Sequence, residues 1–332
     1  MNAEKIREEA GQLKDTIIAD RRYLHTHPET GFDLTETKAY VKKELISMGY
    51  EPIDCGKAGL VVNAGGKKPG RVFLIRGDMD ALPMPEESGE PFACPTGKEA
   101  HTCGHDFHAA MLLTAAKMLK ENEAELEGTV KFMFQPAEET FQGGKNMLEN
   151  GILENPHVDA ALAYHVSPGK MPVGIYMYNS TGTMMFSVDG FKITVTGKGG
   201  HGAYPHTSID PINIAVHVYL ALEALIAREA DPNKACVLTV GQFTAGTAEN
   251  IIPNNAVMKG TIRTNDKTNR ELLVRRMKEV AIKTAEVYGG TAEVEMLSEV
   301  PPLICDPKLT EEFVGYMKEL NIPGAMPYPG IS

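Results

Sequence analysis

The chain reads Val72-Phe73-Leu74-Ile75-Arg76-Gly77-Asp78-Met79-Asp80 near its first quarter, a short apolar run that ends in acidic residues. The apolar part predicts a buried β-strand. Similar runs lie at 60–62, 129–134 and 160–165, and segments with helical spacing lie at 35–48, 107–119 and 144–150. This alternation predicts an α/β domain with a mainly parallel sheet. The glycine-rich segment 64–70 predicts a hairpin turn between the first two strands.

The pattern changes after Gly182. Strand-like and helical segments then follow in the order β-α-β-β-α-β, at 186–195, 211–227, 237–243, 256–263, 268–288 and 291–297. This order is typical of the ferredoxin-like split βαβ fold, and it is complete within about a hundred residues. We therefore expect an inserted domain at 184–297. The first domain would comprise 1–183 together with 298–332.

The composition narrows the class of protein. The chain has 332 residues, and 33 Lys and Arg against 44 Asp and Glu give a net charge of −11, which argues against nucleic acid and anionic membrane as partners. Its five cysteines are odd in number, and its charged N-terminus lacks the apolar core of a signal peptide. We therefore expect reduced thiols in the cytoplasm. We also expect no membrane span, because no apolar run approaches about 18 residues.

Side chains that can bind metals cluster at four places, at 76–80, 101–108, 135–139 and 164–166. Each place follows a predicted strand or precedes a helix, and ligands of open α/β sheets bind outside the carboxyl ends of the strands. Thiolate, imidazole and carboxylate are the ligands that suit zinc and its neighbours. A lone Cys is more often a small buried side chain, and two adjacent Glu are more often a solvated pair. Their joint occurrence nevertheless predicts a metal site.

The residue types also indicate a chemistry. Cys103 and His105 are two residues apart, so they can bind one metal or bridge two. Glu138 and Glu139 are adjacent, and we expect their side chains to diverge, so that one binds metal and the other acts as a base toward water. This arrangement suits amide hydrolysis. The sequence has no G-x-S-x-G elbow, no Walker A loop and no H-E-x-x-H, and the glycines at 197–202 do not form G-x-G-x-x-G.

The second predicted domain adds three polar side chains, His201, Asn250 and Arg263. Taken singly, each is more often a turn residue or a charge at a strand end. Together they offer an imidazole, an amide and a guanidinium, which suit a carboxylate or a developing oxyanion.

These segments together resemble the M20 metallopeptidase family, and within it the amidohydrolase branch. That branch holds the N-acyl-amino-acid, hippurate and indoleacetyl-amino-acid hydrolases. The matching runs stand in family order at 25–29, 77–83, 101–108, 134–139, 165–166, 197–206 and 250–253. The Cys-Gly-His run at 103–105 distinguishes this branch from relatives that have carboxylate ligands there.

The resemblance implies a catalytic domain with two divalent metal ions, held by Cys103, His105, Glu139 and His165. It implies that Glu138 is the general base that activates water and then protonates the leaving amine. Asp80 would orient the site from behind the ligands. Thiolate and imidazole favour zinc, and the carboxylate leaves manganese, cobalt or nickel as alternatives.

The resemblance also assigns roles in the inserted domain, which would be a lid and a dimerisation domain. His201 would reach the active site of the partner subunit and stabilise the tetrahedral oxyanion there. Asn250 and Arg263 would hold the free carboxylate of a small-molecule substrate. We accordingly expect a homodimer formed through this domain.

The implied activity is hydrolysis of the linear amide bond of N-acyl amino acids, with N-acetyl and N-benzoyl compounds as examples. One alternative is a dipeptidase or carboxypeptidase of the same fold. Another is a non-catalytic form that binds metal or carboxylates. Family members carry a further metal-binding His near the C-terminus, and none of the ten His here lies after His217. We therefore expect either that the printed chain is truncated before that ligand or that this form binds metal poorly.

Overall fold

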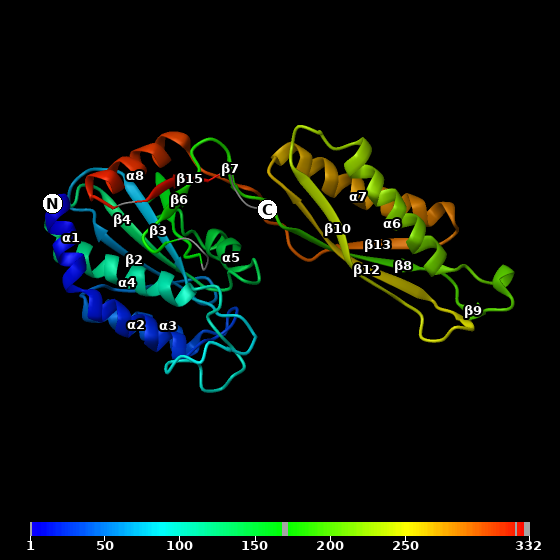
Figure 1. The fold of residues 1–332 in the computed structure, drawn as a ribbon, viewed down its shortest axis with the longest axis horizontal. Helices are drawn as coiled ribbons and strands as arrows, with labels where there is room; N and C mark the ends of the chain where they lie inside the picture. Colours follow the sequence, from blue (N-terminus) through cyan, green and yellow to red (C-terminus); the bar gives the residue numbers. More distant parts are fainter. Residues whose placement is uncertain (1, 168–171, 323, 329–332) are drawn as a thin grey trace. The chain divides into compact units, whose positions relative to one another are not determined.

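The computed structural model describes residues 2–167, 172–322 and 324–328 (Figure 1). The chain divides into two compact units, residues 1–171 and 172–332, and each is described by itself. The domain boundaries expected at 183/184 and 297/298 stay a prediction.

A mixed five-stranded sheet forms the centre of the first unit, with the strand order β1-β2-β4-β3-β5. The strands are β1 (Ile53–Cys55), β2 (Gly59–Gly65), β3 (Val72–Asp78), β4 (Thr129–Gln135) and β5 (Ala160–Ala163). β3 runs parallel to β4 and β5, whereas β2 is antiparallel to β1 and β4. Only β2 among these strands therefore runs against the others, which confirms the predicted α/β fold with a mainly parallel sheet.

The predicted hairpin at 64–70 is wrong, because β4 lies between β2 and β3. Phe132 of β4 pairs with Val62 on one side and with Ile75 on the other. The glycine-rich segment instead packs against the residue before β4, since the N–H of Gly66 donates to the carbonyl of Gly128. Gly128 is required there, because a Cβ atom would lie 2.1 Å from the carbonyl oxygen of Arg71. The local turn signal could not show that a third strand enters between the two.

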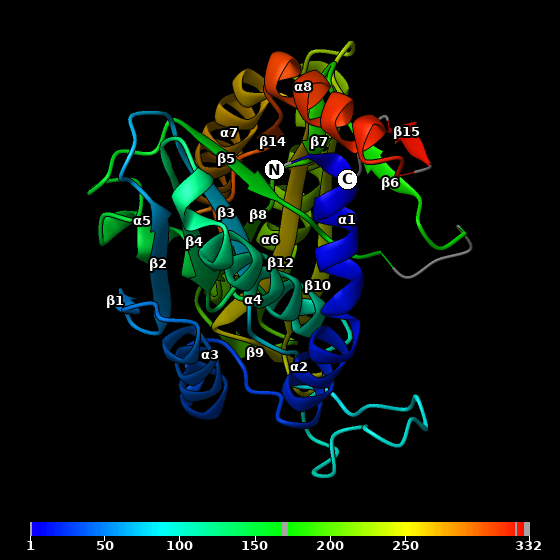
Figure 2. The ribbon, with the colours of Figure 1, turned by 90° about the vertical axis from the view of Figure 1, so that its left-hand side faces the viewer.

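Helices cover both faces of this sheet (Figures 1 and 2). They are α1 (Ala3–Gln12), α2 (Lys14–Thr26), α3 (Thr35–Ser47), α4 (His105–Glu121) and α5 (Gly143–Glu149), with a short 3-10 helix at Glu123–Glu125. Side chains alternate along a strand, so Phe132 and Phe134 of β4 join the core under α2, α3 and α4. Met133 points the other way and packs with Met147 of α5.

The second unit contains the predicted β-α-β-β-α-β order. Its elements are β8 (Asp189–Thr196), α6 (Pro211–Arg228), β10 (Cys236–Ala245), β12 (Asn255–Thr264), α7 (Lys267–Val287) and β13 (Thr291–Met296). The four strands form an antiparallel sheet in the order β10-β12-β8-β13. The apolar faces of α6 and α7 pack on it and form a single core.

Shorter elements complete the second unit. They are β6 (Tyr176–Tyr178), β7 (Thr183–Met185), β9 (Gly200–His201), a 3-10 turn (Pro205–Thr207), β11 (Ile251–Ile252), β14 (Leu303–Ile304), α8 (Pro307–Glu319) and β15 (Ala325–Pro327). The short strands among them form three two-stranded sheets, β9 with β11, β7 with β14 and β6 with β15.

Helix α6 bears on the expectation that the chain has no membrane span. Among the described residues, α6 is long and apolar enough to cross a membrane by length and composition. Its buried residues include Ile214, Val218 and Leu222, which belong to the core of the antiparallel sheet. The core helix of a folded domain passes the same test, so the finding is weak support for a span.

Candidate metal centre

Segments that lie far apart in the sequence converge at the carboxyl ends of β3, β4 and β5. These strands run parallel, and α4, which packs on β3, begins at His105. His105 belongs to three groups of possible metal ligands: with Cys103 and His165, with Glu138 and Glu139, and with Asp78 and His108. Within each group the ligand atoms lie within 4.8 Å of one another. The structure therefore places Cys103, Glu139 and His165, three of the four residues predicted to bind metal, around the imidazole of the fourth, His105.

The imidazole of His105 is fully buried and has a defined orientation. Its Nδ1 atom lies 2.7 Å from the backbone oxygen of Asp80, so Nδ1 carries the proton and donates it there. Burial lowers its pKa, but the neighbouring Asp80, Cys103 and Asp78 together raise the pKa of His105 to about 11. The ring thus lies in a strongly negative environment, which stabilises a cation.

Cys103 and His165 face each other beside His105. The Sγ atom of Cys103 lies 3.3 Å from Nε2 of His165. Nδ1 of His165 lies 2.6 Å from the carbonyl oxygen of Val166, so Nδ1 donates and Nε2 keeps its lone pair toward the thiol. Burial lowers the pKa of His165, which favours the neutral form that can bind a metal. The neighbouring His105 lowers the pKa of Cys103, but burial and the charge of Glu139 raise it overall.

The two glutamates come from the turn after β4. Oε2 of Glu138 and Oε1 of Glu139 each lie 3.8 Å from Nε2 of His105. Their carboxylates thus converge, contrary to the expectation that adjacent side chains diverge. That expectation holds for an extended strand, whereas Ala137 before them has φ 50° and starts a tight turn.

Asp80 holds this turn in place. Its Oδ1 accepts the backbone N–H of Glu138 at 2.9 Å, and its Oδ2 accepts that of Glu139 at 3.1 Å. Burial raises the pKa of Glu138, and the negative charges of Asp78 and Glu139 raise it further. The positive charges of His105 and Arg76 lower it, but the net effect is a raised pKa. A carboxylate with a raised pKa is well suited to accept and return a proton near neutral pH.

The donor set fits a bound metal ion. Nε2 of His105 and Oε1 of Glu139 are buried and have no hydrogen-bond partner within the described ranges. Unpartnered polar atoms are costly in a protein interior, and a cation among them removes that cost. Thiolate, imidazole and carboxylate are the ligands found at zinc sites.

The predicted substrate residues lie in the second unit. His201 of β9 pairs with Ile251 of β11, and the N–H of Gly202 donates to the carbonyl of Asn250, so His201 and Asn250 lie side by side. Arg263 lies near the far end of β12. It lies eight positions after Asn255, the first residue of that strand, which is about 26 Å at the usual rise. The unit therefore brings His201 and Asn250 together without Arg263, and the roles of all three stay predictions.

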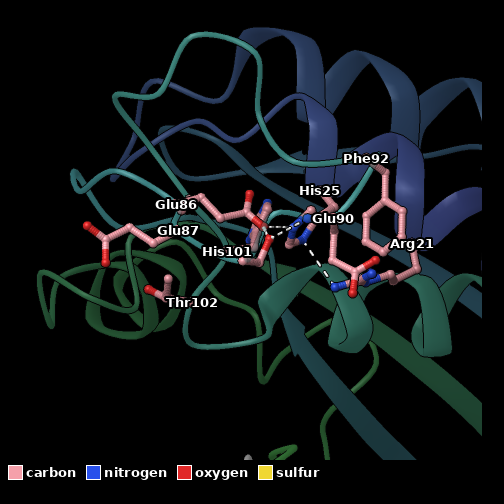
Figure 3. A pocket seen from close by; sticks show the side chains of 10 residues that line it. Arg21, His25, Glu86, Glu87, Glu90, Phe92, His101 and Thr102 are labelled. Carbon is pink, nitrogen blue, oxygen red and sulfur yellow. Dashed lines mark hydrogen bonds and ion pairs between the residues drawn. The ribbon is translucent and has the colours of Figure 1, made fainter.

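Sequence reasoning missed two buried networks beside the ligands. In the first, His25 bridges two acids: Nδ1 lies 2.8 Å from Oδ2 of Asp106, and Nε2 lies 3.0 Å from Oε1 of Glu86. His25 and Glu86 line a cavity of about 340 Å³ together with Arg21, Phe92 and His101 (Figure 3). The presence of His25 and Asp106 inside two of the quoted runs was the only signal available.

The second network joins Asp78 and His108. Nδ1 of His108 lies 2.5 Å from Oδ1 of Asp78, and Nη1 of Arg76 lies 2.7 Å from Oδ2. Burial raises the pKa of Asp78, but the hydrogen bond from His108 and the charge of Arg76 outweigh it and lower the pKa to about 2. Asp78 is therefore a permanent anion behind the ligands.

Comparison with known proteins gives a consistent result. The model of the family described as peptidase family M20/M25/M40 matches residues 74–331. An N-acyl-L-amino acid amidohydrolase of Geobacillus stearothermophilus is 38% identical over 299 residues, which are 88% of this chain and 79% of that protein. Thermostable carboxypeptidase 2 of Saccharolobus solfataricus is 35% identical over 324 residues, which are 96% and 81% of the two chains.

A solved structure is similar over nearly the same length. It is a Bacillus subtilis protein described as a dinuclear metal binding peptidase from the M20 family. Its TM-score is 0.79 at 32% identity, and the match covers 96% of this chain and 83% of that one. Both the sequence and the fold are thus similar to known proteins over most of the chain.

Proposed function

This chain belongs to peptidase family M20/M25/M40, and we propose that it hydrolyses the amide bond of N-acyl amino acids with the help of bound metal ions. The products are a carboxylate and a free amino acid. The observation that carries the proposal is the convergence of Glu138 and Glu139 on His105, which is also close to Cys103 and His165. A relative at 38% identity that is named an N-acyl-L-amino acid amidohydrolase supports this class of substrate.

We propose two divalent ions, zinc before manganese, cobalt or nickel, held by Cys103, His105, Glu139 and His165. The thiolate favours zinc, and a similar structure described as dinuclear supports the number of ions. When bound, such ions polarise the amide carbonyl and lower the pKa of water. The tautomers of His105 and His165 support their role, because each Nδ1 donates to a backbone oxygen and Nε2 remains as the possible ligand atom.

The side chain of Glu138 performs the proton transfers in this proposal. Its carboxylate takes a proton from water as the water attacks the amide carbon, and it returns that proton to the leaving nitrogen. Burial raises its pKa, which brings both steps closer to neutral pH. Asp80 keeps the carboxylate in place through the backbone N–H groups of Glu138 and Glu139.

In this proposal the second unit binds the remainder of the substrate. The imidazole of His201 stabilises the oxyanion in the active site of the partner subunit, while the amide of Asn250 and the guanidinium of Arg263 bind the free carboxylate. We assign the lid and dimerisation domain to 184–297, which includes the whole antiparallel sheet.

We further propose that the second unit forms a homodimer. α6 has an exposed apolar stripe at helical spacing, formed by Ile212, Val216, Tyr219 and Leu220. β10 is an edge strand of the antiparallel sheet, so one row of its backbone groups is open to another chain. Apolar patches of this kind are common at protein interfaces.

We also propose a cytoplasmic location, which agrees with the free thiols of all five cysteines.

The activity test uses the full chain with a panel of N-acetyl and N-benzoyl amino acids. We expect release of the amino acid, loss of release with a chelator, and recovery when zinc or manganese is added back. The relative at 35% identity that is named a carboxypeptidase favours peptide hydrolysis as the second candidate. Faster cleavage of dipeptides than of N-acyl amino acids would support it, and metal binding without turnover of either would support a non-catalytic form.

A further inference from the structure

His165 lies outside regular structure, although it is a proposed metal ligand. β5 ends at Ala163, so His165 stands in the loop that follows an edge strand of the sheet. A ligand in such a loop needs support if its imidazole is to keep one position. The contacts that supply this support involve two buried side chains without a role in the proposed chemistry, Asp78 and His108.

The hydrogen bonds of His108 have a single possible direction. The backbone N–H of Val166 can only donate, and it lies 2.9 Å from Nε2 of His108, so this nitrogen accepts. The ring proton is therefore on Nδ1, which donates to Oδ1 of Asp78. Asp78 is fully buried and its charge is balanced by Arg76. The neutral tautomer of His108 is thus fixed by its two neighbours.

The chain of contacts continues from Val166 to His165. The N–H of Val166 is held by His108, and the carbonyl oxygen of Val166 accepts Nδ1–H of His165 at 2.6 Å. The side chain of Val166 also packs on Gly104, where an added Cβ would lie 2.4 Å from its Cγ2 atom. Val166 is therefore anchored at its N–H and its side chain, and it orients the ring of His165 so that Nε2 faces Cys103.

We propose that Asp78 and His108 are positioning residues that hold His165 through the peptide groups of Val166, a role that rests on the proposed function of His165 as a ligand. Asp78, His105 and His108 also form a group with metal-ligand spacing. A metal bound there would have to displace the ring proton of His108 from Oδ1 of Asp78 and compete with Arg76 for Oδ2. These existing contacts favour a supporting role over a second set of ligands.

The test uses two substitutions of similar size at His108. In His108→Gln the amide oxygen can reach the position of Nε2 and still accept from Val166. In His108→Asn the shorter amide reaches Asp78 only. We expect His108→Asn to lower the affinity for zinc by about 10- to 100-fold, as loss of a partner behind a ligand does, with the number of bound ions unchanged. His108→Gln should retain most of the affinity.

Two results would overturn the proposal. If both variants lose zinc affinity to the same extent, or if neither loses it, the acceptor for the Val166 N–H is unimportant. A reduced number of bound ions would make His108 a ligand. Lys131→Met is the stability control, because the ammonium of Lys131 donates to three backbone carbonyls away from the ligands. It should destabilise the protein without a selective effect on zinc affinity.

A second measurement needs no metal, so it separates this proposal from the proposed activity. Exchange of the Val166 amide hydrogen is followed in metal-free protein. Loss of its hydrogen bond in His108→Asn should speed exchange by roughly five- to tenfold, the effect of about 1 kcal/mol. In His108→Gln the Val166 amide hydrogen should exchange as in wild type. The same is expected of Asp78→Asn, because its amide oxygen still accepts the Nδ1–H of His108. Equal exchange rates in wild type and His108→Asn would contradict the proposal even if the enzyme is active.

Discussion

The backbone oxygen of Asp80 lies 2.7 Å from Nδ1 of His105. Its carboxylate accepts the backbone N–H groups of Glu138 and Glu139. One residue therefore orients the central imidazole and the turn that carries both glutamates. The site depends on the end of β3 as much as on the ligands themselves.

Loss of the Asp80 side chain should reduce turnover. Asp80→Ala leaves two backbone N–H groups without an acceptor and releases the turn at 138–139. We expect kcat to fall by about 10- to 100-fold. Asp159→Ala is a matched control, because Asp159 also accepts one backbone N–H, that of Val72, at the opposite end of β3. Equal kcat in Asp80→Ala and wild type, measured on an N-acetyl amino acid, would contradict this role.

The pH dependence of hydrolysis should report on Glu138. Burial raises the pKa of this carboxyl, and only its ionised form accepts a proton. The value of kcat/KM should therefore fall on the acid side, with a midpoint above the ordinary value for glutamate of about 4.3. Metal content is measured at each pH to exclude loss of the ions. A midpoint at or below the ordinary value, with the metal retained, would exclude a base with a raised pKa.

The His25 network should make folding stability depend on pH. The hydrogen bond to Asp106 raises the pKa of His25 above 6.5, although burial lowers it. The stability that His25 adds to the fold is therefore fully present below pH 6.5. It is lost as the pH rises through the pKa of His25 in the folded protein. For Glu86, hydrogen bonds from Ser88 and His25 outweigh burial and lower its pKa to about 2. The stability that Glu86 adds to the fold is therefore fully present above pH 4.5 and is lost as the pH falls toward 2.

We accordingly expect this network to be most stabilising between pH 4.5 and 6.5. Urea unfolding across pH should show a loss of stability above pH 6.5 that is smaller in His25→Gln. His157→Gln is the control, since His157 pairs with Glu154 at the surface. The same pH dependence in wild type and His25→Gln would show that His25 does not contribute.

The proposed homodimer can be tested at Leu220, whose side chain is 58% exposed on α6. Leu220→Arg puts a charge into the apolar stripe and should shift the protein to a monomer. Leu148→Arg is the control, because Leu148 of the first unit is 54% exposed. Light scattering coupled to size-exclusion chromatography gives the mass of each variant. A monomeric wild type, or a dimeric Leu220→Arg, would exclude this surface as the interface.

The sequence predicted the order of elements and the location of the ligand clusters. Both follow from local signals: apolar runs of strand length, and the rule that parallel strands open their carboxyl ends to ligands. The clusters could therefore be located in advance, whereas the choice of Cys103, His105, Glu139 and His165 as ligands came from the family resemblance and stays a proposal. Their grouping around His105 follows from the parallel pairing of β3 with β4 and β5.

Other features depend on contacts that a local pattern does not contain. The hairpin prediction failed because β4, more than fifty residues later, lies between β2 and β3. The convergence of Glu138 and Glu139 depends on the positive φ of Ala137. The hydrogen bond between His108 and Val166 joins residues 58 positions apart. Such pairings are decided by packing, and the residue types alone allow many of them.

Substitution of Glu138 by Gln tests the central claim most directly. The full chain and Glu138→Gln are loaded with zinc, and bound metal and hydrolysis of an N-acetyl amino acid are measured on the same samples. The account predicts equal metal content and a loss of hydrolysis of about 100-fold or more, because the amide cannot accept the proton. Hydrolysis by Glu138→Gln at the wild-type rate, with metal bound, would contradict it.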